Sequence, residues 1–286
     1  MPSPPVGNIS DTARWVAAYR AMESERPDAH FRDPFARELA GEQGARIVEQ
    51  MPAGHSTAWA FVVRTCVIDE LVTRVVRESS ADMVVNLAAG LDTRPYRMEL
   101  PASLSWVEVD LPAILEYKRE KLASARPVCR LESVALDLSD VAARRALFAR
   151  LSGSASRALV ITEGLLVYLS REEVGVLAAD LHAAASFRWW ILDVVSPDLL
   201  RWLQRRYQRS LAAAGAPLRF GPEEGTEFYR PFGWKTVEFR SSFDESRRLR
   251  REMPGAWLFR LMMRLSPPAR RERMRRMGGL ALLERT

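Results

Sequence analysis

The segment from residue 83 to residue 110 restricts the possible folds of this chain more than any other. An apolar run at 83–85 leads into a turn of small residues, and a second apolar run at 106–110 ends in a carboxylate. Asp110 follows Gly90 by 20 residues, which is typical of a site for an adenine nucleoside at the carboxyl ends of parallel strands. The segment therefore predicts an α/β fold with a nucleoside cofactor.

The composition of the turn indicates which cofactor. A dinucleotide site uses three glycines to bring backbone amides close to a pyrophosphate, whereas this turn reads Ala88, Ala89, Gly90 and then acidic Asp92. S-adenosylmethionine has an adenosine, a sulfonium cation and no phosphate, so it tolerates a nearby carboxylate. The alternative interpretation is an ordinary strand and turn, because glycine-poor turns after strands are common.

Three long motifs are similar to those of a known family. They read N-L-A-A-G-L-D-T-R-P-Y-R at 86–97, W-V-E-V-D-L-P at 106–112 and T-E-G-L-L-V-Y-L at 162–169. In these motifs the chain resembles the leucine carboxyl methyltransferase family, which includes the TcmP-like O-methyltransferases of polyketide pathways. Segments at 12–17, 31–36 and 278–284 extend the resemblance over nearly the whole chain. The resemblance implies S-adenosyl-L-methionine as cofactor and a class I, Rossmann-like methyltransferase fold.

Short apolar runs alternate with helical stretches in the middle of the chain, which predicts a doubly wound, mainly parallel sheet covered on both faces. The expected strands are 83–87, 106–110, 132–137, 159–162 and 189–194, and the expected helices between them are 112–122, 141–151 and 171–185. For the later runs at 235–239 and 280–284, the resemblance implies an antiparallel strand pair.

Without repeats or a low-complexity linker, residues 1–286 are expected to form a single methyltransferase domain. Within it, residues 10–78 predict an N-terminal helical cap and residues 79–195 the cofactor-binding core. Residues 196–286 are expected to supply substrate-side helices and the terminal strand pair.

Composition argues for a cytoplasmic enzyme. The hydrophobic content is 48%, and no apolar run approaches the length that a membrane span requires. Residues 1–5 lack the features of a signal peptide. Cys66 and Cys129 are expected to be small buried apolar residues rather than a bridge. The three histidines have no paired spacing, so no metal site is predicted.

The net charge of +6 has a local origin, because residues 240–276 carry 12 arginines against four acidic residues. A solvated helix face is the commoner explanation for such a segment, although it can also steer an acidic substrate or contact a membrane surface. No nucleic-acid-binding motif accompanies it, so nucleic acid is not an expected partner. The oligomeric state is not determined by the sequence.

Two carboxylates at strand ends are candidate cofactor ligands. Asp110 can accept hydrogen bonds from both ribose hydroxyls, and the alternative is a helix cap ahead of Pro112. Glu163 ends the fourth strand at the switch point of the sheet. There it can hold the ammonium of the cofactor, and the alternative is a solvated strand end.

The resemblance implies further cofactor-binding positions. Arg64 corresponds to an arginine that binds the cofactor carboxylate, although from the residues alone it is only an arginine on a helix. Asp137 corresponds to a position that contacts the amino edge of adenine, and Leu138 to backbone contacts and apolar cover. Ala88 stands where the family has glycine, at the closest approach to the methionine part of the cofactor. Arg94, next to the small-residue turn, is as well suited to a structural ion pair as to contact with the cofactor.

The sequence identifies no catalytic residue. An ionised carboxylate acceptor needs only positioning and exclusion of water, whereas a phenol gains from a base, for which His55 is the first candidate to mutate. We expect O-methylation of a small molecule, polyketide-like or another secondary metabolite. The nearer alternative is carboxyl methylation of a protein or peptide terminus. A nicotinamide-dependent oxidoreductase and a nonenzymatic basic binding module are more distant alternatives.

Overall fold

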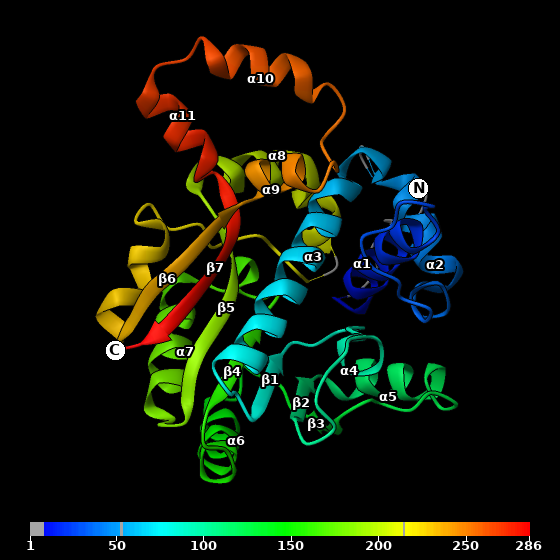
Figure 1. The fold of residues 1–286 in the computed structure, drawn as a ribbon, viewed down its shortest axis with the longest axis vertical. Helices are drawn as coiled ribbons and strands as arrows, with labels where there is room; N and C mark the ends of the chain where they lie inside the picture. Colours follow the sequence, from blue (N-terminus) through cyan, green and yellow to red (C-terminus); the bar gives the residue numbers. More distant parts are fainter. Residues whose placement is uncertain (1–8, 52–53, 214) are drawn as a thin grey trace.

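The structure, a computed structural model, describes residues 9–51, 54–213 and 215–286. Its centre is a seven-stranded sheet with the order β3-β2-β1-β4-β5-β7-β6 (Figure 1). The strands are β1 (Met83–Leu87), β2 (Ser105–Asp110), β3 (Arg130–Ala135), β4 (Ala158–Thr162), β5 (Phe187–Val195), β6 (Trp234–Ser241) and β7 (Gly278–Arg285). Residues 1–5, for which no signal peptide is predicted, lie outside the described residues.

Strand direction agrees with the prediction of a mainly parallel sheet. The first five strands pair in parallel, with β1 between β2 and β4. The last strand in sequence, β7, inserts between β5 and β6 and is antiparallel to both. The predicted antiparallel pair at the carboxyl-terminal end is therefore confirmed.

Helices precede, connect and follow the strands. They are α1 (Ile9–Ser24), α2 (Ala36–Gln50), α3 (Gly54–Glu78), α4 (Arg94–Arg97), α5 (Pro112–Lys121), α6 (Val141–Ser154), α7 (Arg171–Ala183), α8 (Pro197–Ala213), α9 (Ser242–Arg248), α10 (Ala256–Arg264) and α11 (Pro268–Arg275), with the 3-10 turns η1 (Leu166–Tyr168) and η2 (Gly225–Phe232). The first three helices cover most of the region predicted as a helical cap.

Local sequence explains where the connecting helices begin. Asp140 caps α6 by accepting a hydrogen bond from the Ala143 backbone N–H at 3.0 Å. Ser170 and Glu173 form a reciprocal capping box at the start of α7. Pro112 occupies the first position of α5, where its missing N–H costs no helical hydrogen bond.

The two faces of the sheet are covered by different helices. Apolar residues of α3 pack on one face, against side chains such as Trp106 and Ile161. Residues of α6, α7 and η2 pack on the other face, against side chains such as Val85 and Trp190. A third cluster joins α1, α2 and α5 beside the sheet. The edge of the sheet between these layers carries the loops that follow the parallel strands.

The prediction for β3 was wrong in two respects. The strand spans Arg130–Ala135 rather than residues 132–137, and all of its side chains are exposed or half-buried rather than covered on both faces. Its position explains both differences, because β3 is the edge strand and pairs only with β2. Residues 136–137 therefore belong to the loop that leaves the sheet.

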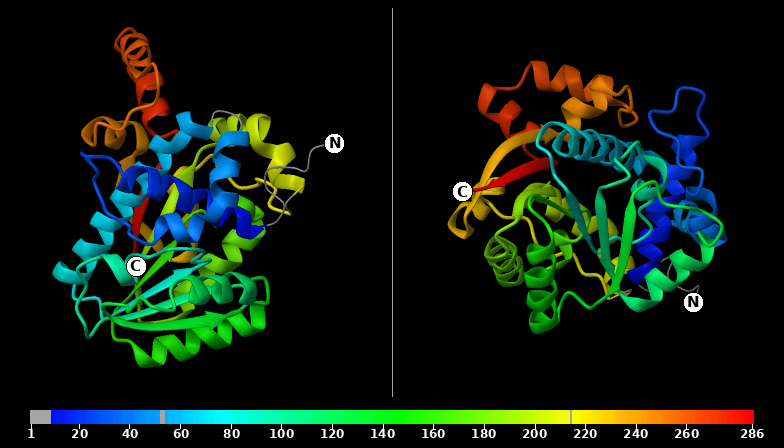
Figure 2. Two further views of the ribbon diagram at one scale, coloured as in Figure 1. Left: turned by 90° about the vertical axis from the view of Figure 1, so that its right-hand side faces the viewer. Right: turned by 60° about the horizontal axis from the view of Figure 1, so that its bottom comes forward.

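The last helices extend from the rest of the molecule. Figures 1 and 2 show α10 and α11 projecting at one end, beyond the layers that cover the sheet. Neither helix has a buried residue. Within the described residues, no helix is both long and apolar enough to cross a membrane. Cys66 and Cys129 are buried free thiols, as predicted.

Candidate cofactor and acceptor sites

A cavity of about 190 Å³ opens where β1, β2 and β4 end. Its position follows from the topology, because the carboxyl ends of parallel strands meet at one edge of the sheet. Five of the seven predicted cofactor-binding residues line it: Arg64, Ala88, Gly90, Asp110 and Glu163. Helix α1 also contributes to the wall, through residues such as Trp15.

The turn after β1 is built on two residues in the left-handed backbone region. Ala88 and Gly90 both have a φ of 53°. Glycine adopts this conformation without steric cost, but the Cβ of an alanine does not, so Ala88 holds a strained position in the cavity wall. The departure from the family's glycine that the resemblance implies at Ala88 therefore coincides with backbone strain.

The Asp110 carboxylate closes this turn from the neighbouring strand. Its Oδ2 accepts a hydrogen bond from the Gly90 backbone N–H at 2.6 Å, and its Oδ1 accepts one from the Leu111 N–H at 2.7 Å. Burial raises the pKa of Asp110, although both backbone donors oppose the shift. Each carboxylate oxygen has a second lone pair, so Asp110 can hold the turn and still accept hydrogen bonds from a ligand.

Glu163 and Arg64 form an ion pair in the cavity wall. Arg64 Nε is 2.8 Å from Glu163 Oε1, and Arg94 Nη1 is 2.8 Å from Glu163 Oε2. Burial acts to raise the pKa of Glu163, but the Arg94 and Arg64 guanidinium groups outweigh it and hold that pKa below the ordinary value. Glu163 is therefore ionised at neutral pH and is not a solvated strand end.

Arg94 has the structural role that the sequence left open. Its buried guanidinium contacts Asp69 at 2.6 Å and Asp92 at 2.9 Å, in addition to Glu163. Burial opposes ionisation of Asp92, but Arg94 overcomes it and lowers the pKa of Asp92 to about 2. This network fixes the turn after β1 to helix α3 and to the end of β4.

The cavity has balanced charge, and a buried amide oxygen in its wall has no hydrogen-bond partner among the described residues. Its charged lining residues are Arg20, Arg64, Asp92, Arg94, Asp110 and Glu163. Asn86 donates a hydrogen bond from Nδ2 to Asp92 at 2.7 Å, while its buried Oδ1 has no partner in the described part of the chain. A zwitterion with further hydrogen-bond donors suits these groups better than a polyanion does.

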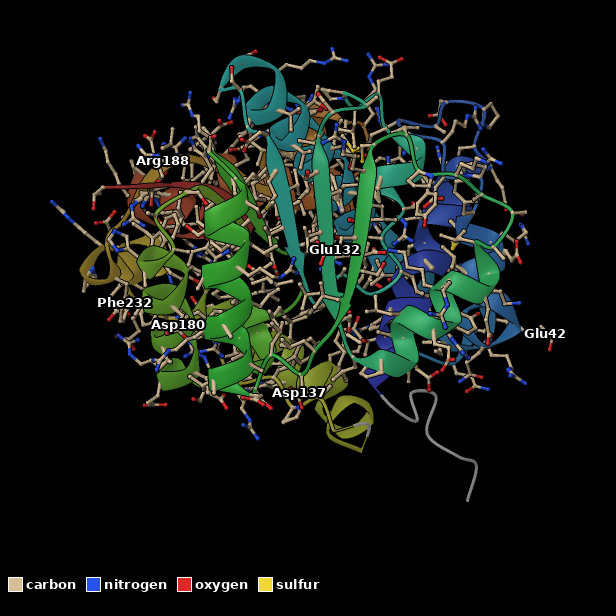
Figure 3. All side chains as sticks on the ribbon, turned by 90° about the horizontal axis from the view of Figure 1, so that it is seen from below. Glu42, Glu132, Asp137, Asp180, Arg188 and Phe232 are labelled. Atoms are coloured by element: carbon tan, nitrogen blue, oxygen red, sulfur yellow. The ribbon has the colours of Figure 1, made fainter. Side chains whose placement is uncertain are left out.

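Asp137 and Leu138 do not line this cavity. Asp137 is exposed in the loop after β3, where Figure 3 labels it, and its Oδ1 accepts a hydrogen bond from the Ser139 N–H at 2.9 Å. That backbone donor lowers the pKa of Asp137. Leu138 is half-buried and packs against the sheet core. The contact of these two residues with adenine remains a prediction.

A second, larger cavity of about 470 Å³ adjoins the first. The two share five lining residues: Trp15, Phe61, Arg64, Gly164 and Tyr168. The remaining wall is largely apolar. It includes residues of β5, β7 and α11 and five aromatic side chains from α3, α8, α9 and α10, namely Trp59, Trp202, Tyr207, Phe243 and Phe259. Among its described lining residues, Arg64 is the basic one and Asp193 the carboxylate. This cavity therefore suits a flat, largely apolar molecule.

Sequence reasoning missed several residues of these walls. Asn86 had a recognisable signal, because it is a polar residue inside a buried apolar strand. Trp15, Tyr168 and Asp193 had no local signal, since their roles depend on which distant segments share the cavity.

His55 lies on the exposed surface and lines neither cavity, so the structure does not support it as a base. Across the described residues, no cluster of His, Cys, Asp and Glu is placed to hold a metal ion.

Comparison with known proteins agrees with this geometry. Residues 13–182, more than half of the chain, match the family described as leucine carboxyl methyltransferase. A protein of Streptomyces coelicolor named "Putative S-adenosyl-L-methionine-dependent methyltransferase" is 38% identical over 178 residues, which are 59% of this chain and 62% of that protein. A protein of the same description from Mycobacteroides abscessus is 34% identical over 196 residues, covering 60% of this chain and 63% of the relative. The matched region is thus slightly under two thirds of each relative.

Solved structures support the fold over almost the full length. A DUF574 family protein from Streptomyces avermitilis superimposes with a TM-score of 0.64 at 14% identity, covering 96% of this chain and 97% of that one. A structure described as a putative methyltransferase from Thermobifida fusca gives a TM-score of 0.58 at 18% identity, covering 99% and 96%. These likenesses establish the Rossmann-like α/β fold. The match of residues 13–182, more than half of the chain, shows that this chain belongs to the leucine carboxyl methyltransferase family.

Proposed function

We propose that this chain is an S-adenosyl-L-methionine-dependent O-methyltransferase that acts on a small, largely apolar molecule. The observation that carries the proposal is the shared wall between the two cavities. A polar cavity at the strand ends meets an aromatic cavity at Tyr168, Phe61 and Gly164. A methyl donor and a methyl acceptor need this adjacency, because transfer requires the two reacting groups to be held in contact and in line.

The charges of the polar cavity suit the amino-acid tail of the cofactor. Arg64 is suited to its carboxylate and Glu163 to its ammonium, because the ion pair between these side chains presents one group of each sign. Asp110 is suited to the ribose hydroxyls. Asn86 Oδ1, buried without a partner in the described chain, offers one more acceptor. When bound, S-adenosylmethionine supplies an electrophilic methyl group.

The aromatic cavity favours a small acceptor. Its volume of about 470 Å³ lies within the roughly 300–1,000 Å³ of typical small-molecule sites. The wall residues exclude water from the reacting groups and orient a planar ring system by stacking. These features are compatible with a polyketide-like or other secondary metabolite.

The alternatives have weaker support. Carboxyl methylation of a protein or peptide terminus is the nearer one, and the family name is its main support. A nicotinamide dinucleotide needs a helix N-terminus directly after β1 to hold its pyrophosphate, but here that helix is α4, which has four residues. The arginine-rich end of the chain is the only support for a basic binding module.

Two measurements test the proposal. Calorimetry with S-adenosylhomocysteine, NAD and duplex DNA is expected to show binding of S-adenosylhomocysteine alone. Methyl-labelled S-adenosylmethionine is then offered with naphthols, hydroxyanthraquinones and a peptide ending in leucine. An alkali-stable labelled ether supports the proposal. An alkali-labile ester on the peptide would establish the carboxyl alternative, and absence of S-adenosylhomocysteine binding would exclude the proposed function altogether.

A further inference from the structure

Asp193 is the one carboxylate among the described residues that line the aromatic cavity. It lies near the end of β5, next to β4, which Glu163 follows, and its Oδ1 accepts a hydrogen bond from the Gly164 backbone N–H at 2.7 Å. Gly164 and its neighbour Tyr168 line both cavities. The carboxylate is therefore fixed beside the segment where the polar and aromatic cavities meet.

In the described part of the chain, no arginine, lysine or histidine forms an ion pair with Asp193, although the other partly buried carboxylates of this edge have cationic or multiple backbone partners. The charged and titratable groups that face it are Arg64 from α3, Glu163 from the loop after β4, Tyr168 from η1 and Tyr229 from η2. Arg64 is engaged by Glu163 at 2.8 Å. A partly buried carboxylate with a backbone hydrogen bond but no ion pair is costly in a largely apolar wall unless a ligand uses its free oxygen.

We propose that Asp193 receives the proton of a neutral hydroxyl group on the methyl acceptor, and that it disfavours acceptors that carry a carboxylate. This inference rests on the proposed function. As the acceptor oxygen forms its bond to the methyl carbon, the bond from that carbon to the cofactor sulfur breaks, and the hydroxyl proton passes to Asp193 Oδ2. The sulfonium charge and the Asp193 charge disappear together, leaving a neutral sulfide, a methyl ether and a carboxylic acid.

Two physical arguments support this assignment. Burial raises the pKa of Asp193, against the opposing effect of the Arg64 guanidinium, which makes the carboxylate a better proton acceptor than an ordinary aspartate. A carboxylate ligand in the same cavity would place two negative charges close together in an apolar environment, where their repulsion is strong. A phenolic hydroxyl carries no such penalty and donates a hydrogen bond to Asp193.

The binding test uses ligands that differ only in the acceptor group. 1-Naphthol and 1-naphthoate are titrated into protein saturated with S-adenosylhomocysteine, with quenching of tryptophan fluorescence as the readout. The wild type is expected to prefer 1-naphthol by at least tenfold, and Asp193→Asn is expected to abolish most of that preference. Asp198→Asn, a matched change on α8 outside both cavities, is expected to retain it. Equal affinities in the wild type, or an unchanged preference in Asp193→Asn, would overturn the assignment.

The kinetic test separates proton transfer from a structural role. With 1-naphthol, Asp193→Asn is expected to lower the single-turnover rate on the order of 10²- to 10⁴-fold, the usual contribution of a general base. With 4-nitro-1-naphthol, whose more acidic hydroxyl is already ionised, the loss is expected to be less than tenfold. In the wild type, the single-turnover rate with 1-naphthol should rise with pH until Asp193 is ionised. The Asp193→Asn variant should not show this rise.

The outcomes distinguish the two proposals. If S-adenosylhomocysteine does not bind, the proposed function fails. If it binds but Asp193→Asn slows both naphthols equally, or keeps the wild-type pH dependence, only the assignment of Asp193 fails.

Discussion

Ala88 links backbone strain to the proposed cofactor site. Its φ of 53° costs a residue with a Cβ about 1–2 kcal/mol relative to glycine, and the Ala88 side chain also forms part of the cavity wall. Strained residues of this kind concentrate at functional sites, where the surrounding structure holds them in place. Here Asp110 supplies that restraint through its hydrogen bond to the Gly90 N–H.

We expect Ala88→Gly to stabilise the protein and to strengthen binding of S-adenosylhomocysteine. Relief of the left-handed strain outweighs the roughly 0.5–1 kcal/mol entropic cost of glycine, so the free energy of unfolding should rise by up to about 1 kcal/mol. Urea denaturation and calorimetry measure the two effects. Ala89→Gly, at a neighbouring alanine without a positive φ, is the control and should lose stability. A comparable loss in both variants would contradict the strain argument.

Asp110 combines a structural and a proposed binding role, so a simple deletion would confuse the two. We expect Asp110→Asn to weaken binding of S-adenosylhomocysteine by about 1–3 kcal/mol, the range for hydrogen bonds to a charged group. The sharper measurement repeats the titration with the 2′-deoxy analogue of that ligand. If Asp110 binds the ribose, the wild type discriminates between the two ligands and the variant does so much less. If the variant discriminates between the two ligands as well as the wild type does, Asp110 only stabilises the turn and does not bind the ribose.

At the scale of elements, the arginines of helix α11 lie outside the cavity at the strand ends. Arg273 Nη2 lies 2.5 Å from Asp198, and Arg275 Nη2 lies 2.6 Å from Asp244. These partners belong to α8 and α9, so the exposed pairs connect the projecting end of the molecule to its neighbouring helices. Exposed ion pairs of this kind contribute about 0–1 kcal/mol each.

We expect joint replacement of the five arginines by glutamine to change the affinity for S-adenosylhomocysteine by less than about twofold. The positions are Arg270, Arg271, Arg273, Arg275 and Arg276. Calorimetry measures this affinity, and the melting temperature checks that the variant is folded. The prediction does not extend to the affinity for the acceptor, because Met274 of the same helix lines the aromatic cavity. A tenfold loss of cofactor affinity would show that this end of the chain closes over the cofactor.

At the scale of the whole molecule, the buried network around Arg94 couples three parts of the fold. It joins Asp69 on α3, Asp92 after β1 and Glu163 after β4. Because Arg94 holds the pKa of Asp92 at about 2, below the unfolded value near ~3.9, ionised Asp92 stabilises the folded state at neutral pH. This contribution is complete above the unfolded pKa and is lost as the pH falls through the folded pKa.

We therefore expect the free energy of unfolding to fall by about 2 kcal/mol between pH 5 and pH 2 from Asp92 alone. Asp92→Asn should remove this part of the pH dependence and cost about 3–5 kcal/mol at pH 7, since it breaks a buried charge pair. Urea denaturation at several pH values measures both. Asp244→Asn, at an exposed carboxylate, is the control and should cost about 0–1 kcal/mol at pH 7. An unchanged pH slope in Asp92→Asn would contradict the role of the network.

The sequence by itself determined the sheet and the position of the proposed cofactor cavity. Short apolar runs between helical stretches predict parallel strands, and the carboxyl ends of such strands share one edge wherever the loops go. Gly90, Asp110 and Glu163 each follow or end a predicted strand, so their approach to one cavity follows from topology. Arg64 joined them only through the family resemblance, because its helix carries no local sign of this role.

Only the tertiary structure decided the conformation of Ala88, the exposure of Asp137 and the place of Asp193 in an aromatic wall. Each depends on packing rather than on local pattern: β3 is exposed because it is the edge strand, and Asp193 meets side chains from helices far away in the sequence. Hydrophobic periodicity and residue spacing predict which face of a helix or strand is buried and where that element ends. They do not report which distant side chains share a cavity, because that depends on how the elements pack together.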